Sequence, residues 1–206
     1  MADTTNISIL AKAPVPGFAK TRLIPALGPD GAAGLQARLI ERTVATACAA
    51  KLGPVRLCAT PDETHPLFGV MQQRFGVTLA RQPDGDLGAR MLAAATEAGG
   101  PVLVIGTDCP ALTVGQLHDM AEVLRGYDAA LIPAEDGGYV LIGLRRPQPV
   151  LFSEIAWGTA TVADETRWLL SAHGLTWREL PALWDVDKPE DLERLRRSGF
   201  AELIGG

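Results

Sequence analysis

The sequence predicts an α/β fold built on a mainly parallel sheet. Short aliphatic runs alternate along the chain with longer segments in which apolar residues recur at helical spacing, the pattern that βαβ units produce. The most apolar run, residues 101–106, lacks polar alternation, as expected of a strand buried on both faces of a parallel sheet. No internal repeat or low-complexity linker interrupts the 206 residues, so one domain spanning residues 1–206 is expected.

Seven short runs are the expected strands. Each is rich in Val, Ile, Leu or Ala, and turn-forming residues follow it. Their ranges are 6–11, 55–60, 77–81, 101–106, 128–133, 139–144 and 176–180.

Six segments carry helical periodicity and helix boundary signals. Asp30 is the expected N-cap of the first helix. Thr113 and Gln116 have the spacing of a capping box. Thr161 with Asp164 marks another helix start. The expected helices cover residues 31–52, 65–75, 87–98, 113 to about 125, 161–173 and 189–197.

Composition excludes several classes of function. Nineteen Lys and Arg against 24 Asp and Glu give a net charge of −5, which argues against a nucleic-acid or anionic-membrane surface and leaves small molecules as the expected partners. No apolar run approaches the length of a membrane span, and the first six residues lack signal-peptide features. Three widely spaced cysteines without a CxxC pair exclude a disulfide framework and a thiolate zinc site, and indicate a cytoplasmic location. Nothing indicates the oligomeric state.

Ligands of parallel sheets bind beyond the carboxyl ends of the strands, so the loops that follow strands are the places to look for chemistry. The first, residues 11–22, combines Lys12, Lys20 and Arg22 with two prolines and a glycine. Cations beside tightly turning backbone favour binding of an anion, most often phosphate. A Walker A loop would need glycine at positions 14 and 19, which hold Pro and Ala, and GxGxxG is absent. A solvated Lys-rich turn remains the alternative.

Two further loops carry polar residues. Residues 82–90 place a glutamine and two glycines where a ligand could approach the backbone, although a plain turn before a helix explains them as well. Asp108 follows the most buried strand and is well placed to ligate a hard cation such as Mg²⁺, with a turn cap as the alternative. Cys109 is next to it, but no histidine lies near these loops in the sequence, so a Cys–His catalyst is not expected.

The fourth group combines residues 135–139 (EDGGY) with residues 185–190 (DVDKPE). Asp185 and Asp187 are two apart in an extended segment and face the same side, so both could address one metal or phosphate. Asp187 with Glu190 also has the spacing of a capping box for the last helix. The capping-box alternative accounts for Asp187 but gives no role to Asp185.

Five motifs stand in order: AKAPVPGFAKTRL, QPDGDLGARM, GTDCPAL, PAEDGGYVLIGL and DVDKPEDL. Together they resemble the bacterial DUF2064 family of rSAM/selenodomain-associated, or arsenosugar-type, transferases. That family is placed in the nucleotide-diphospho-sugar transferase (GT-A) superfamily, together with molybdenum-cofactor and phospholactate guanylyltransferases. The resemblance spans residues 11–192, with small departures at Cys109, Lys188 and Gly158.

The resemblance implies a Rossmann-like GT-A fold, with a nucleotide-binding half at about residues 1–112 and an acceptor half at about residues 113–206. It implies Mg²⁺ or Mn²⁺ as cofactor, held by Asp108 and by one of Asp185 or Asp187. It gives catalytic roles to Asp108, to Lys20 and to Asp136 as a base. The residues implied to contact the nucleotide are Ala11, Lys12, Gly17, Lys20, Arg22, Gln82, Gly85, Asp86, Leu87 and Gly88. Those implied on the acceptor side are Glu135, Asp136, Gly138, Tyr139, Trp157 and Thr159.

The function expected on these grounds is metal-dependent transfer from a nucleotide-activated donor, in which cations offset the charge of a leaving diphosphate. The main reading is glycosyl transfer from a nucleotide-sugar to a small-molecule acceptor. The alternative is nucleotidyl transfer from a nucleoside triphosphate to a phosphorylated acceptor, with release of pyrophosphate. A third reading is a nucleotide-binding module without catalysis.

Overall fold

The computed structural model describes residues 4–205, so the first three residues, which were considered above for a signal peptide, lie outside it. Its centre is a seven-stranded sheet with the order β3-β2-β1-β4-β6-β5-β7. All neighbouring strands are parallel except β6, which runs antiparallel to both β4 and β5. The prediction of a mainly parallel α/β sheet is confirmed. The strands are β1 (Asn6–Lys12), β2 (Val55–Thr60), β3 (Thr78–Arg81), β4 (Val102–Ile105), β5 (Ala129–Pro133), β6 (Tyr139–Leu144) and β7 (Trp177–Glu179).

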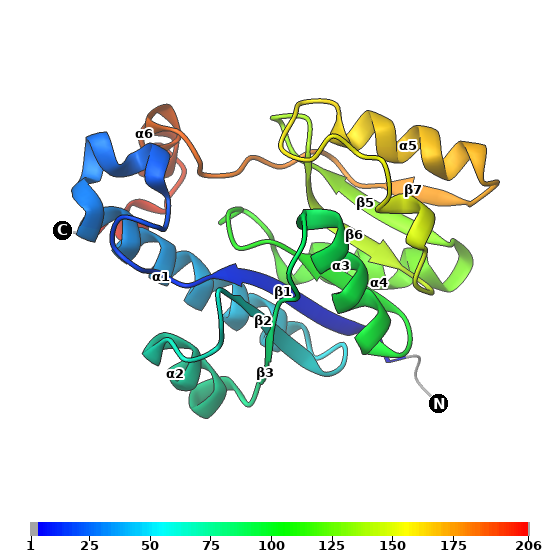
Figure 1. Ribbon diagram of the computed structural model, residues 1–206, viewed down its shortest axis with the longest axis horizontal. Helices are drawn as coiled ribbons and strands as arrows, with labels where there is room; N and C mark the ends of the chain where they lie inside the picture. Colours follow the sequence, from blue (N-terminus) through cyan, green and yellow to red (C-terminus); the bar gives the residue numbers. More distant parts are fainter. Residues whose placement is uncertain (1–3, 206) are drawn as a thin grey trace.

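Helices cover both faces of this sheet (Figure 1). Alternate residues of each central strand point to opposite faces. In β4, Leu103 and Ile105 join one buried cluster with residues of α1 and α4, whereas Val102 and Val104 join another with residues of α3 and α5. Burial on both faces explains why this strand is apolar throughout. The helices are α1 (Ile24–Ala50), α2 (Pro66–Phe75), α3 (Leu87–Ala98), α4 (Val114–Gly126), α5 (Val162–Ala172) and α6 (Pro189–Arg197), with short 3₁₀ turns at Thr21–Leu23, Pro149–Leu151 and Ala201–Leu203.

The expected cap of the first helix is wrong. The first helix begins at Ile24 and is interrupted at Gly28, whose φ of 69° and ψ of 169° break the helical path. Asp30 therefore lies just inside the second part of α1 and does not cap its start. The expected helix start at Thr161 is confirmed, because Thr161 is the N-cap residue of α5. Its hydroxyl donates to Glu165 (2.6 Å), and Asp164 pairs with Arg167.

The capping box at the start of α4 is confirmed. The backbone N–H of Gln116 donates to the Thr113 hydroxyl (3.2 Å), and the Gln116 side chain accepts from the backbone N–H of Thr113 (2.9 Å). These paired bonds satisfy backbone donors that the first turn of a helix leaves open.

The segment after β7 runs back across the carboxyl edge of the sheet before α6 begins (Figure 1). Leu183 bridges to Ala134, and its carbonyl accepts from the backbone N–H of Glu135 (3.0 Å). Three residues later, the N–H of Val186 donates to the carbonyl of Asp108 (2.8 Å). Residues 181–188 therefore join the loops that follow β4 and β5, and they place α6 in a buried cluster with the beginning of α1.

Among residues 4–205, no helix is both long enough and apolar enough to cross a membrane. The three cysteines are all free thiols. This agrees with the exclusion of a disulfide framework.

Candidate active site

The fold brings the predicted motifs to one edge of the sheet. Residues 11–22 leave the end of β1, residues 82–88 leave β3, and Asp108 follows β4. The turn 134–138 connects β5 to β6, and the segment 181–188 crosses beside it. Carboxyl ends of parallel strands share an edge, so residues distant in sequence meet there.

At the centre of this edge, Lys20 contacts Asp108. The Lys20 ammonium donates to Asp108 Oδ1 (2.7 Å) and to the carbonyl of Val186 (2.6 Å). Its side chain is only 4% exposed, whereas that of Asp108 is 46% exposed. Lys20 has a left-handed backbone (φ 47°, ψ 45°), a conformation that costs energy in a residue other than glycine and is often found at functional sites. One ammonium thus holds together the loops that follow β1 and β4 and the crossing segment.

Asp185 lies among carboxylates. Its pKa is raised from 3.8 to about 6, first because burial removes it from water and then because Asp136 and Asp108 repel its charge. The nearby Lys20 ammonium opposes this shift only in part. The charge of the Asp185 carboxylate is therefore compensated only in part by the groups around it.

These residues fit a divalent cation that is shared with a phosphorylated ligand. Within residues 4–205, no group of three or more His, Cys, Asp or Glu side chains is arranged to hold a metal by itself. Mg²⁺ commonly takes one or two carboxylates from the protein and its remaining oxygen ligands from phosphates and water. Asp108 and Asp185 offer such oxygens, and their mutual repulsion would be relieved by a cation between them.

Asp187 differs from Asp185 in its surroundings. Its carboxylate forms an exposed ion pair with Arg22, so the two aspartates have different partners although they are two residues apart. The expected capping box of Asp187 and Glu190 is wrong. Asp191 instead accepts from the backbone N–H groups of Asp187 (2.9 Å) and Lys188 (2.7 Å). The cap of α6 therefore uses neither Asp185 nor the Asp187 carboxylate.

The residues of the first loop differ in their exposure to solvent. Ala11 is a buried strand residue whose carbonyl accepts from Gln82, whereas Lys12 and Gly17 are exposed. Gly17 has a φ of 83°, which suits glycine in a tight turn. The Lys12 side chain is thus open to a ligand, while Lys20 is held by Asp108.

The loop after β3 is used partly for packing. The Gln82 amide donates to the carbonyls of Cys58 (2.7 Å) and Ala11 (3.3 Å), which bind it into the sheet. Asp86 caps α3 by accepting from the backbone N–H of Ala89 (2.8 Å). At Gly88, an added Cβ would lie 2.6 Å from the carbonyl oxygen of Phe152. Of the residues predicted here to contact a nucleotide, the exposed ones are Gly85, Asp86 and Leu87.

Several residues predicted on the acceptor side have structural partners. Glu135 forms a two-bond ion pair with Arg194 (2.5 and 2.8 Å), which lowers its pKa. The Tyr139 hydroxyl points inward to Met91 Sδ (3.7 Å), and burial raises its pKa.

The neighbouring loop packs over this turn. Trp157 meets the Tyr139 ring edge-on, with the ring centres 6.4 Å apart. Thr159 bonds to Ala156 and Thr161 within its own loop. An added Cβ at Gly137 would lie 2.1 Å from the Ala160 carbonyl oxygen, so this close approach requires glycine.

Asp136 remains the exposed carboxylate of this turn, oriented by the backbone N–H of Gly138 (2.9 Å). Cys109 is buried, and burial raises its pKa to about 11, so its thiol is protonated at neutral pH. A buried thiol with a raised pKa is a weak nucleophile.

Sequence reasoning missed two residues that support the site. Gln36 in α1 is buried and donates to the Thr107 hydroxyl (3.1 Å) and to the Lys12 carbonyl (3.4 Å), thereby connecting the ends of β4 and β1. Arg42 donates to the carbonyl of Pro110 (2.7 Å). A glutamine between Leu35 and Leu39 on an otherwise apolar helix face is the signal that could have identified Gln36.

Comparisons with known proteins agree with this architecture. The profile of the family described as "Uncharacterized protein conserved in bacteria (DUF2064)" matches residues 43–159. The chain is 31% identical over 207 residues to phosphoenolpyruvate guanylyltransferase from Rubrobacter xylanophilus, covering 94% of this chain and 96% of that protein.

Solved structures share the fold. A Desulfovibrio desulfuricans G20 protein, provisionally described as a nucleotide-diphospho-sugar transferase, superimposes with a TM-score of 0.82 at 30% identity, covering 97% of this chain and 96% of that one. Rv0371c of Mycobacterium tuberculosis H37Rv, crystallised with manganese, superimposes with a TM-score of 0.57 at 18% identity, covering 95% and 100%.

The raised pKa of Asp185 predicts how stability changes with pH. An acid whose folded-state pKa is raised makes the folded protein less stable as pH rises from the unfolded value near 4 through about 6. We expect Asp185→Asn to stabilise the protein without ligands by roughly 1 kcal/mol at pH 7.5, after allowance for partial exposure, and by less at pH 4.5. Urea unfolding of both proteins at the two pH values measures this; a gap that does not widen with pH would contradict it.

Proposed function

The chain belongs to the DUF2064 family, whose profile covers more than half of it, and we propose that within this family it is a nucleotidyltransferase. Its reaction in this proposal moves a nucleoside monophosphate unit from a nucleoside triphosphate to a small phosphorylated acceptor. Pyrophosphate is the second product. The chain is a nucleotide-utilising transferase, and the proposal specifies which group it transfers.

One observation carries the proposal. The identity to a guanylyltransferase extends over 94% of this chain and 96% of that protein, so the likeness includes the nucleotide half, the acceptor half and the crossing segment. A site with cations on one side and carboxylates on the other is consistent with this chemistry. The likeness favours nucleotidyl transfer, which the sequence analysis gave as the alternative, over glycosyl transfer, which was its main prediction.

The reaction needs charge stabilisation more than covalent help from the protein. An acceptor phosphate oxygen forms a bond to the α-phosphorus, the bond from that phosphorus to the bridging oxygen breaks, and pyrophosphate leaves with the electron pair. Lys12, Lys20 and Arg22 lie at the loop after β1, where they stabilise the leaving charge. A divalent cation, when bound at Asp108 and Asp185, supplies further neutralisation of phosphate charge.

Arg22 and Lys20 are held in place before any ligand arrives. Asp187 pairs with Arg22, and Asp108 pairs with Lys20, so both cations are directed by carboxylates on other segments. An ammonium has three donors, and two of them bond to Asp108 and Val186. In this proposal the third N–H donates to a phosphate oxygen.

Glycosyl transfer, including arsenosugar-type transfer, is the second candidate. It is favoured by the 30% identity and the TM-score of 0.82 to the provisionally described nucleotide-diphospho-sugar transferase. The two reactions differ in what they demand at the acceptor. A sugar acceptor attacks through a hydroxyl that must lose a proton, whereas a phosphate monoester, with a second pKa near 6, is already ionised at neutral pH.

Product analysis tests the proposal directly. The protein is incubated with Mn²⁺, each of the four nucleoside triphosphates and small phosphorylated acceptors, and in parallel with nucleotide-sugars and hydroxyl acceptors. We expect acceptor-dependent release of pyrophosphate. Release of nucleoside diphosphate from a nucleotide-sugar would replace the proposal with glycosyl transfer. If neither product formed, the protein would be a nucleotide-binding module without catalysis.

The Asp136→Asn variant distinguishes the same two reactions, because only a hydroxyl acceptor needs a general base to remove its proton. With a phosphate acceptor no base is required, so turnover should stay within about 10-fold of wild type. With a hydroxyl acceptor, loss of a general base costs roughly 100-fold or more. Steady-state rates with saturating nucleotide provide the measurement. Nucleotide affinity should be nearly unchanged in either case, because the resemblance assigns Asp136 to the acceptor and not to the nucleotide.

Asp108→Asn should abolish metal-dependent activity while the fold survives. The amide keeps an oxygen for the Lys20 ammonium but removes the charge that attracts a cation. Turnover should fall by at least ~100-fold, because metal neutralisation of phosphate charge contributes several kcal/mol. The rise in melting temperature on adding Mn²⁺ with nucleotide should disappear.

The matched control is Asp187→Asn, which removes a carboxylate that faces Arg22. That variant should retain the rise in melting temperature produced by Mn²⁺. If Asp108→Asn retained an equal rise, Asp108 would only shape its turn.

A further inference from the structure

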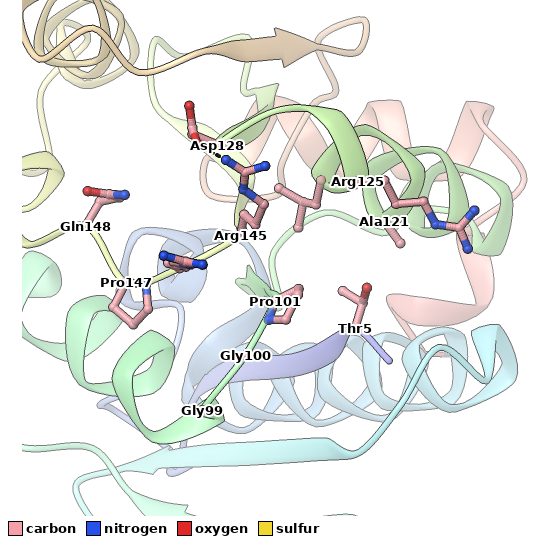
Figure 2. A pocket seen from close by; sticks show the side chains of 12 residues that line it. Thr5, Gly99, Gly100, Pro101, Ala121, Arg125, Asp128, Arg145, Pro147 and Gln148 are labelled. Carbon is pink, nitrogen blue, oxygen red and sulfur yellow. Dashed lines mark hydrogen bonds and ion pairs between the residues drawn. The ribbon is translucent and has the colours of Figure 1, made fainter. Parts of the chain in front are cut away.

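A cavity of about 780 Å³ opens at the amino edge of the sheet (Figure 2). Its walls come from the loop after α3, the end of α4 and the loop after β6, and Pro101 lies where β4 begins. Its volume falls in the range of small-molecule sites, roughly 300–1,000 Å³. None of the five sequence motifs contributes to it.

This cavity is separate from the candidate active site. Pro101 lines the cavity just before β4, whereas Asp108 lies just beyond the other end of the same strand. Seven residue steps at about 3.3 Å each place the two roughly 20 Å apart. A ligand of nucleotide size at the carboxyl edge therefore does not fill it.

The charge of the lining is opposite to that of the chain. Arg125, Arg145 and Arg146 line the cavity with a single carboxylate, Asp128, in a protein whose net charge is −5. Arg125 lies in the last turn of α4, where it neutralises helix carbonyls, and it pairs with Glu122 (2.8 Å). Arg145 and Arg146 directly follow the strand β6, so neither arginine serves to neutralise the carbonyl groups at the end of a helix.

Arg145 is held rigidly in place. Its guanidinium donates to Asp128 Oδ1 (2.5 Å), as Figure 2 shows. Asp128 is itself fixed, because its other oxygen accepts from the backbone N–H (3.0 Å) and the hydroxyl (2.8 Å) of Thr176. A guanidinium has five N–H donors in a planar fork, so one carboxylate leaves donors for a second anion.

We propose that this cavity is a second binding site, for a small molecule that carries phosphate groups. Arg145 and Arg146 bind its oxygens, and the guanidinium fork matches phosphate geometry with two parallel hydrogen bonds. With Arg125 paired to Glu122, the guanidinium groups of Arg145 and Arg146 face the one lining carboxylate, Asp128, and the remaining positive charge suits an anionic ligand. This site does not depend on which group is transferred at the carboxyl edge.

Calorimetric titration of the full chain with inorganic pyrophosphate, without divalent metal and at low salt, tests the proposal. We expect binding that Lys20→Ala, at the carboxyl edge, leaves in place, and that the double variant Arg145→Ala/Arg146→Ala weakens by about 10-fold or more, as the loss of charge-assisted hydrogen bonds predicts. Arg146→Gln keeps the Arg145–Asp128 pair and should still weaken binding several-fold. This single variant keeps the test valid if the double variant does not fold.

Arg197→Ala removes an exposed arginine on α6 and controls for the loss of charge alone. The proposal is overturned if Arg146→Gln binds pyrophosphate like wild type, if Arg197→Ala weakens binding equally, or if Lys20→Ala alone abolishes it. Citrate provides the last arm. Equal affinity for citrate would overturn the assignment to phosphate and indicate a site for oligoanions in general.

Discussion

The arrangement of the carboxyl edge depends on one buried ammonium group. Lys20 is nearly inaccessible to water, so its charge must be compensated by protein groups. It obtains this from Asp108 after β4 and from the carbonyl of Val186 in the crossing segment. The backbone N–H of Val186 in turn donates to the carbonyl of Asp108. These contacts fix the relative positions of three segments that are far apart in the sequence.

The negative charge of Asp185 is only partly compensated by nearby positive charge. One ammonium serves a region that contains Asp108, Asp136 and Asp185, and the half-buried Asp185 carboxyl responds with a raised pKa. A protein selected for stability alone would gain by replacing such a carboxylate with a neutral residue. Retained repulsion of this kind is typical of sites that receive a cation or a proton during their work. The negative charge is therefore better explained by a ligand than by the fold.

The two edges of the sheet group their charges differently. Around Lys20 the carboxyl edge places Asp108, Asp136 and Asp185, while the amino edge places arginines beside Asp128. β4 joins the two directly, and it is buried on both faces. Both edges are therefore built on the ends of one central strand whose residues are all buried.

The sequence alone determined the elements whose signals are local. Residues 55–60, 87–98, 139–144 and 189–197 form their elements with the predicted limits, since runs of apolar residues, Gly99 and Pro189 act on their own neighbours. It also identified Lys20, Asp108, Asp136 and Asp185 as polar residues in loops that follow strands. A local signal failed at Asp30, because the helix begins earlier, at Ile24, and is interrupted at Gly28.

Only the tertiary structure decided which of these residues meet. Lys20 contacts Val186, which is 166 residues away in the sequence, and Glu135 contacts Arg194, which is 59 residues away. Gln36 joins the site from a helix that carries none of the motifs. The antiparallel insertion of β6 between β4 and β5 sets which loops are neighbours. A charge selects its partner by distance in space and by access to water, and both are set by the order of strands in the sheet, which no short stretch of sequence encodes.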